Sequence, residues 1–186
     1  GFDDPVNPDE VVHPDAAATP AVPVAVAQVS ETLLSPLSGR VLPLSAVPDD
    51  VFSKGLLGQG IAILPDRGEL RSPVNGVVVT FLPSKHAVGI LSDSGAEVLI
   101  HIGIDTVNLN GTHFTSSLQV GDRVRSGEVL VTFDAEAVIA AGYALITPVL
   151  IVNSDDYSSV QVLAGETAAM GTPLLALTTT KQADTL

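Results

Sequence analysis

The sequence predicts an all-β protein, an antiparallel β-sandwich with one or two short helical turns. Val, Leu, Ile, Gly and Pro are frequent, whereas aromatic residues make up only 4% of the chain. That composition favours short strands and turns over helices. Short apolar runs recur between residues 40 and 178, separated by Gly, Pro, Asp and Ser. Runs at this spacing are typical of a sandwich or a barrel.

Residues 1–32 are rich in Pro and Ala and show no apolar periodicity, so we expect a flexible linker there. The folded domain is expected to span residues 33–180, and a C-terminal tail to follow at 181–186. The expected strands within the domain are RVLPL (40–44), GIAILP (60–65), GVVVTFL (76–82), HAVGIL (86–91), EVLIHIG (97–103), EVLVTF (128–133), PVLIVN (148–153) and PLLALT (173–178).

Two short helical segments interrupt the strands. The stretch DAEAVIAAG (134–142) is rich in Ala, begins at the capping residue Asp134 and ends at Gly142. These are the start and stop signals of a short helix. A second helical turn is expected in DDVFSKG (49–55).

The domain also contains an internal repeat. SPLSGRVLPL (35–44) resembles SPVNGVVVTFL (72–82), and VGDRVRSGEVLVTF (120–133) resembles LAGETAAMGTPLLAL (163–177). Two copies of a half-motif predict a sandwich of the barrel-sandwich type, built from two similar halves. Domains of that type can carry a biotinyl or lipoyl group on a lysine at a hairpin tip. Neither of the glycine-containing repeats contains a lysine, so that carrier chemistry is not expected here.

Charge and composition exclude several classes of function. The formal net charge is −13 and the eight basic residues are scattered, so nucleic acid is not an expected partner. An acidic surface suits a basic protein partner or serves solubility alone. The chain has no cysteine, which removes disulfides, Cys-based zinc sites and Cys nucleophiles. No apolar run approaches about 18 residues, so direct insertion into a membrane is not expected.

Two histidines, His86 and His101, lie in the stretch HAVGILSDSGAEVLIHIG (86–103), which predicts a hairpin. A four-residue turn would pair Leu91 with Ala96 and place the two histidines opposite each other, with Cβ atoms about 4.5–5.5 Å apart. A three-residue turn would shift the pairing by one and separate the rings, unless a bulge restored them. The histidines are either core residues or one site, and their placement side by side favours a site.

Two neighbouring imidazoles without cysteine suggest few kinds of chemistry. Zinc usually needs a third protein ligand, and neither His113 nor an Asp falls at a recognised spacing. A serine hydrolase would need a G-x-S-x-G motif, which the sequence lacks. A nucleophilic histidine remains: one ring nitrogen accepts a phosphoryl group while the other donates to a carbonyl. A second imidazole can then hydrogen-bond the phosphoryl oxygens.

Three stretches, residues 35–65, 72–111 and 120–134, resemble the glucose-type IIA domain of the bacterial phosphoenolpyruvate-dependent sugar phosphotransferase system. The resemblance covers roughly residues 33–178, and HIGIDTVNLNG (101–111) is its most specific part. The piece AAGYALITPVLIVNSDDY (140–157) is more similar to the β-glucoside and sucrose branch of that family. In that branch the IIA domain usually ends a long permease chain and is joined through a linker to a membrane domain.

The resemblance implies a role for each residue of the site. It implies that His101 is phosphorylated on Nε2 and that His86 is the second active-site histidine, needed to pass the phosphoryl group onward. The Ser84 hydroxyl would orient His86, and the Gly103 carbonyl would hold the hydrogen on Nδ1 of His101. A rim that partner proteins touch is expected at Phe52, Asp49 and Asp105.

The function implied is that of a phosphotransferase component, a phosphoryl carrier in sugar uptake. His101 would accept the phosphoryl group from the histidine-containing carrier protein HPr and pass it to a cysteine of a IIB domain, with a covalently linked IIC domain in the membrane. The expected location is cytoplasmic, at the inner face of the cell membrane. No cofactor is required, although a zinc ion could bridge His86 and His101. Two alternatives are a regulatory module that binds proteins according to its phosphorylation state and a zinc-dependent peptidase-like β-sandwich.

Overall fold

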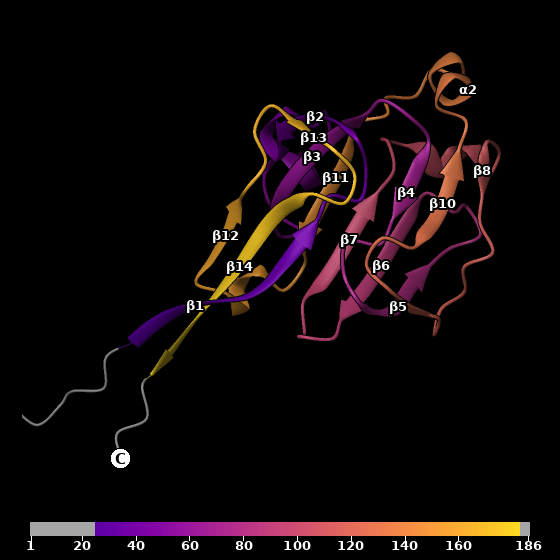
Figure 1. The fold of residues 1–186 in the computed structure, drawn as a ribbon. Coiled ribbons are helices and arrows are strands. Elements are labelled where there is room, and N and C mark those ends of the chain that lie inside the picture. The colour runs from indigo at the N-terminus through magenta and orange to yellow at the C-terminus, as the bar shows by residue number, and fades with distance from the viewer. Residues whose placement is uncertain (1–24, 183–186) are drawn as a thin grey trace, which may run out of the picture.

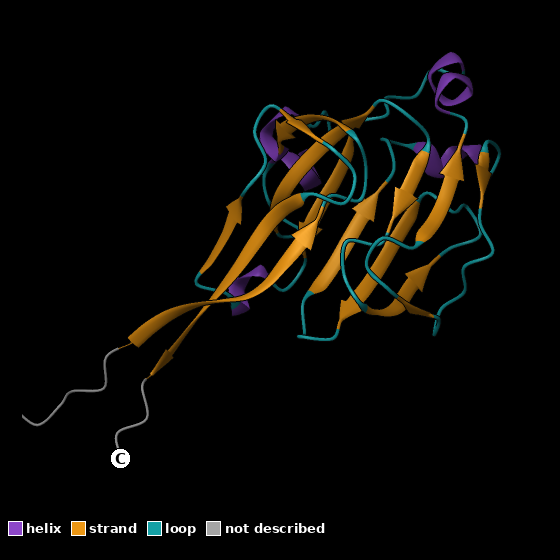
Figure 2. Cartoon of the chain, in the orientation of Figure 1, coloured by secondary structure: helices purple, strands orange, loops and turns teal. Residues whose placement is uncertain are grey.

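The computed structural model describes residues 25–182, which form a layered β structure with few helices (Figures 1 and 2). All strand pairs are antiparallel. The expected all-β sandwich is therefore confirmed. Within these residues, no helix combines the length and the apolar character needed to cross a membrane.

The strands form three sheets. The largest has the order β13 (Thr167–Ala168), β2 (Gly39–Pro43), β3 (Gln59–Pro65), β11 (Thr147–Ile151), β7 (Glu97–His101), β6 (Ala87–Ser92), β5 (Gly76–Phe81) and β9 (Arg123–Val124). The two smaller sheets have the orders β1 (Ala25–Leu34), β14 (Pro173–Gln182), β12 (Ser159–Val162), and β4 (Glu69–Arg71), β10 (Val129–Phe133), β8 (Phe114–Thr115). Each of the eight expected strands corresponds to one of these elements, with shifted ends.

The N-terminal strand β1 differs from the expectation. The predicted linker extends to residue 32, but residues 25–34 pair with β14, from Ala25 opposite Gln182 to Leu34 opposite Pro173. The linker prediction is therefore wrong for residues 25–32, and the tail prediction for 181–182. Ala, Gln, Ser and Glu lie among the valines of residues 25–31, so β1 lacks an apolar run like those of the expected strands. Residues 1–24 and 183–186 of the two predictions lie outside the described residues.

Both predicted helical segments are confirmed. Helix α1 (Asp50–Ser53) begins at Asp49, whose side chain accepts a hydrogen bond from the Val51 amide at 2.9 Å. Helix α2 (Ala135–Ala140) begins at Asp134, and Gly142 follows it with a positive φ of 97°. Three short 3₁₀ turns complete the structure, η1 (Leu44–Ala46), η2 (Thr106–Leu109) and η3 (Ser154–Asp156).

The largest sheet separates two apolar clusters. On one face Ile61, Ile63, Val149 and Ile151 belong to the main core, which also contains residues of the two smaller sheets. Because side chains alternate along a strand, the neighbouring residues face the other way. On this opposite face of the sheet, a second cluster lies under η1 and α1. It is formed by Leu44, Val47, Phe52, Ala62, Ile104, Ile146 and Leu150. The predicted site lies beside this second cluster.

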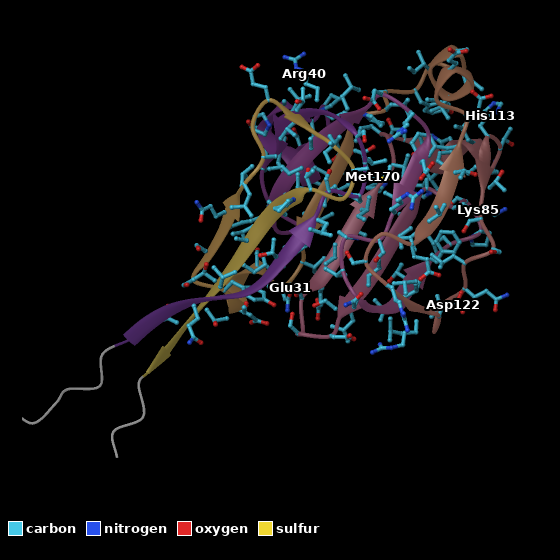
Figure 3. All side chains as sticks on the ribbon, viewed as in Figure 1. Glu31, Arg40, Lys85, His113, Asp122 and Met170 are labelled. Carbon is cyan, nitrogen blue, oxygen red and sulfur yellow. The ribbon has the colours of Figure 1, made fainter. Side chains whose placement is uncertain are left out.

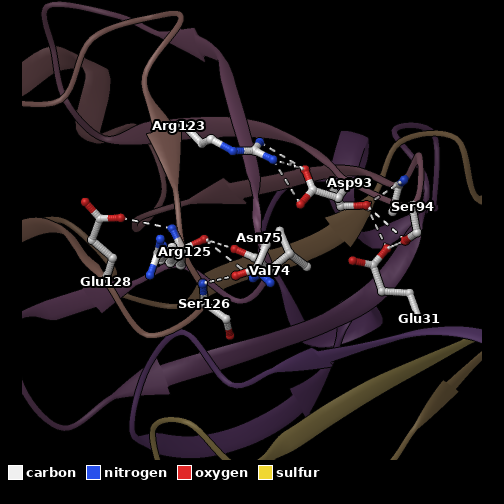
Figure 4. A network of polar contacts seen from close by, with 12 residues as sticks. Glu31, Val74, Asn75, Asp93, Ser94, Arg123, Arg125, Ser126 and Glu128 are labelled. Carbon is white, nitrogen blue, oxygen red and sulfur yellow. Dashed lines mark hydrogen bonds and ion pairs between the residues drawn. The ribbon is translucent and has the colours of Figure 1, made fainter.

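A polar network fixes the turn of the hairpin that carries both histidines (Figure 4). Glu31 of β1 accepts hydrogen bonds from Ser94 and, at 2.7 Å, from Ser92. The Asp93 carboxylate forms an ion pair with Arg123 at 3.1 Å. The hairpin is therefore anchored at its turn, and its open end carries the histidines.

Candidate functional site

The β6–β7 hairpin has the three-residue turn and not the four-residue one. The Ser92 amide donates a hydrogen bond to the Ala96 carbonyl at 2.8 Å, and this bond closes a turn of residues 93–95. Gly95 ends this turn with a φ of 99°, a conformation that glycine adopts at little cost. Leu91 consequently pairs with Glu97, and His101 pairs with Ala87. The register that placed His86 directly opposite His101 is therefore wrong.

The two rings nevertheless meet, because His86 lies outside the regular strand. β6 begins only at Ala87, and the preceding Lys85 has a left-handed backbone with φ 56°. The alternation of a strand therefore does not apply to His86, although its carbonyl accepts a hydrogen bond from the Ile102 amide at 2.6 Å. The ring centroids of His86 and His101 lie 4.8 Å apart, with the planes at 82°.

The His101 ring has a defined hydrogen-bond partner. Its Nδ1 lies 2.6 Å from the Gly103 carbonyl oxygen. A carbonyl can only accept, so Nδ1 carries the hydrogen and Nε2 of the neutral ring keeps a lone pair. Gly103 has a φ of 73°, and a Cβ there would lie 2.7 Å from the Ala144 oxygen and 2.7 Å from Cγ2 of Thr106. Only glycine fits at this position without displacing its neighbours.

His86 is buried, with 4% of its surface exposed. Its Nδ1 lies 2.8 Å from the Ser84 hydroxyl, so the expected contact between these residues is present. Burial, together with the neighbouring charge of His101, lowers the pKa of His86 from 6.5 to about 4. The His86 ring is therefore uncharged at neutral pH.

His101 is half-buried, and burial lowers its pKa below 6.5. The Gly103 carbonyl and the carboxylates of Asp49 and Asp105 act in the opposite direction, since each favours the protonated ring. The net effect is a neutral imidazole at neutral pH. A neutral ring with a free Nε2 is a nucleophile.

The three expected rim residues have different surroundings. Asp49 is half-buried at the start of α1, and Asp105 is exposed with a φ of 59° before η2. Phe52 is only 6% exposed, and its ring centroid lies 5.1 Å from that of His101. Phe52 therefore packs against the His101 ring from within the second cluster, with little of its own surface exposed. Val51 and Leu56, which lie close to Phe52 in the chain, are exposed.

The remaining candidates lie away from the pair. His113 is exposed beside β8 (Figure 3). Among residues 25–182, no cluster of three or more His, Cys, Asp or Glu side chains is arranged to hold a metal ion. A hollow of about 780 Å³ is lined by Arg40, Arg67 and Thr167 among others, but by neither His86 nor His101. This hollow is therefore separate from the histidine pair.

Sequence reasoning missed two buried threonines behind His101. Thr106 donates a hydrogen bond from Oγ1 to the Ile102 carbonyl at 2.5 Å. Thr147 accepts one from the Gly103 amide at 3.4 Å. A hydroxyl residue in the apolar run ITPVLIV (146–152) was the available signal, because a buried hydroxyl needs a partner.

The family model that matches this chain describes EIIA 1 of the phosphoenolpyruvate-dependent sugar phosphotransferase system and covers residues 31–157. The β-glucoside-specific EIIBCA component of Dickeya chrysanthemi is 47% identical over 176 residues, which are 91% of this chain and 28% of that protein. The β-glucoside-specific EIIBCA component of Bacillus subtilis (strain 168) is 54% identical over 128 residues, 69% of this chain and 21% of that protein. The chain thus spans about a quarter of the length of these relatives.

A solved structure is similar as well. Glucose permease IIA from Mycoplasma capricolum superposes with a TM-score of 0.70 at 33% sequence identity, over 79% of this chain and 94% of that one. The sequence and structural matches agree on the same part of the chain. The protein therefore belongs to the type 1, glucose-type EIIA family of the phosphoenolpyruvate-dependent sugar phosphotransferase system.

Proposed function

We propose that this chain carries a phosphoryl group on Nε2 of His101, which it accepts from phosphorylated HPr and passes to a cysteine of a IIB domain. The observation that carries the proposal is the hydrogen bond of 2.6 Å between Nδ1 of His101 and the Gly103 carbonyl, because it leaves Nε2 as the acceptor. The pKa of His101, lowered by burial, keeps this nitrogen unprotonated at neutral pH.

In the first step, the Nε2 lone pair of His101 attacks the phosphorus of the donor phosphohistidine. The new P–N bond forms as the old one breaks, and the donor ring retains the electron pair. The His101 ring keeps its Nδ1 hydrogen and becomes positive, and the Gly103 carbonyl stabilises that charge. The carboxylates of Asp49 and Asp105 act in the same direction, since both raise the pKa of His101.

In the second step, the IIB thiolate attacks the same phosphorus and the neutral His101 ring leaves. We assign His86 a role in this transfer. If the Ser84 hydroxyl donates to Nδ1 of His86, the remaining hydrogen of the neutral ring is on Nε2, where it can bond a phosphoryl oxygen. The 4.8 Å between the ring centroids is compatible with both imidazoles contacting one phosphoryl group.

We further propose that the chain is the EIIA part of a permease that takes up a β-glucoside, located on the cytoplasmic side of the membrane. Its relatives are named as β-glucoside-specific EIIBCA components, which supports a link to IIB and IIC domains. The chain contains no cysteine, so the acceptor thiol of this scheme belongs to another part of that protein.

The test is incubation of the chain with phosphoenolpyruvate, enzyme I and HPr. One phosphoryl group should be added, and it should be labile to acid and stable to base, as an N-linked phosphate is. His101→Ala should abolish the labelling. His113→Ala, which changes an exposed histidine outside the site, should leave it unchanged. Stoichiometric labelling of the His101→Ala protein would show that another residue is the acceptor.

A further inference from the structure

One peptide unit behind His101 is held at both ends by buried threonines. The carbonyl of the Ile102–Gly103 peptide accepts from Oγ1 of Thr106 at 2.5 Å, and its amide donates to Oγ1 of Thr147 at 3.4 Å. Both threonine side chains are 0% exposed. Thr147 also donates its only hydroxyl hydrogen to the Leu145 carbonyl at 2.8 Å. Its oxygen can therefore only accept from Gly103.

The next peptide unit carries the carbonyl that faces the ring. Its amide, that of Ile104, donates to the Ala144 carbonyl at 3.0 Å, and its carbonyl, that of Gly103, accepts from Nδ1 of His101 at 2.6 Å. When the planes on both sides of Gly103 are fixed, its φ and ψ are fixed too. The direction of the Gly103 carbonyl thus depends on the two threonine hydroxyls as well as on the strand pairing.

We propose that Thr106 and Thr147 are positioning residues whose hydroxyls hold the Gly103 carbonyl against Nδ1 of His101 and so determine which ring nitrogen is free to react. Without them, the glycine peptide can turn, because Gly103 has no side chain to restrict it. The ring then takes either tautomer, and Nε2 carries a hydrogen for part of the time. The effect on the ring is independent of the proposed phosphoryl transfer, whereas the effect on the transfer rate rests on it.

The first measurement is the tautomer of His101 in the unphosphorylated protein, from long-range ¹⁵N–¹H NMR spectra at neutral pH. The parent protein should show hydrogen on Nδ1. Thr106→Val and Thr147→Val, which keep the shape of the side chain and remove the hydroxyl, should show a mixture of both tautomers. Thr106→Ser and Thr147→Ser should restore the parent spectrum, because serine retains the hydroxyl.

The second measurement is the rate at which each variant accepts a phosphoryl group from phospho-HPr. The valine variants should be slower by about tenfold, a factor equal to roughly 1.4 kcal/mol. Ser72→Ala is the matched control. It removes a buried hydroxyl that donates to the Val74 carbonyl at 2.6 Å, in another turn of the fold. It should lower stability without changing the tautomer or the rate.

Valine variants that keep the Nδ1 hydrogen and the parent rate would overturn the proposal. Serine variants that behave like the valine variants would do so as well, since packing and not the hydroxyl would then be the cause. The two threonines hold opposite ends of the peptide, so either one tests the proposal if the other variant does not fold. If phospho-HPr never labels the parent protein but the valine variants still show a mixture of tautomers, the proposed function is refuted and the positioning role is supported.

Discussion

Acidification is expected to destabilise the folded chain through His86. This side chain is 4% exposed, and its pKa is lowered from 6.5 to about 4 by burial and by the charge of His101. Between these two values the unfolded chain binds a proton that the folded chain does not. The free energy of unfolding therefore falls as the pH decreases through this range, and the His86 contribution is constant above and below it.

The size of the effect follows from the two pKa values of His86, 6.5 and about 4. At about 1.4 kcal/mol per pH unit, the free energy of unfolding should fall by roughly 3 kcal/mol across the whole range. That is a large fraction of the stability of a domain of this size, which is on the order of 10 kcal/mol. The transition should therefore be measurable in ordinary urea unfolding experiments.

The assay is urea unfolding followed by circular dichroism at a series of pH values, for the parent protein and for His86→Gln. Glutamine does not titrate, and the acidic residues contribute similarly to both proteins. The difference between the two curves therefore reports the titration of His86 together with its coupling to His101. Between about pH 7 and about pH 4, we expect the free energy of unfolding to fall by roughly 3 kcal/mol more for the parent protein than for the variant. A constant offset between the curves would mean that the folded His86 titrates normally, and the reasoning from burial would be refuted.

Four further outcomes are expected. His86→Gln should accept a phosphoryl group from HPr but pass it poorly to the IIB cysteine, because the Ser84 hydroxyl that orients the imidazole does not orient the glutamine amide in the same way. Normal sugar phosphorylation in a reconstituted assay would remove His86 from the mechanism. Phe52→Ala should lower the free energy of unfolding by about 3 kcal/mol, since it empties a buried position beside His101; a change below about 1 kcal/mol in urea unfolding would contradict its burial. Asp49→Asn and Asp105→Asn should slow association with HPr and flatten its salt dependence in titrations at low and high salt, because charges at a rim mainly steer the encounter; an unchanged salt dependence would place the docking face elsewhere. Gly103→Ala should lower the free energy of unfolding by roughly 2 kcal/mol, because Gly103 has a left-handed backbone. The same variant should be labelled more slowly by HPr. An unaltered labelling rate would show that the Gly103 carbonyl tolerates displacement.

The parts of the site that were predictable depend on residues close together in the chain. The Ser84–His86 and His101–Gly103 contacts each join residues two positions apart. The cap of α1 at Asp49 is similarly local. The family resemblance implied the two contacts of the histidines, and it could do so residue by residue because each lies within a short motif.

The parts that were not predictable depend on packing between distant segments. The burial of Phe52 beside His101 requires α1 to close over the second apolar cluster. The hydrogen bond from Gly103 to Thr147 joins β11 to the loop after β7, 44 residues apart. Nothing in the sequence near Phe52 or Thr147 shows which strand lies next to it, so the burial of Phe52 and the contact of Thr147 were not predicted.

The sequence by itself determined eight of the strands, the two short helices and the pair of histidines, since apolar runs, caps and turn residues act over a few positions. Only the tertiary structure decided the hairpin register, the pairing of β1 with β14 and the neutral state of the buried His86. A one-residue change in the turn reverses every side chain of a regular strand, and only the irregular backbone at Lys85 brings the two rings together. The reason is physical: register, burial and pKa depend on which surfaces exclude water, and that follows from contacts between segments far apart in the chain.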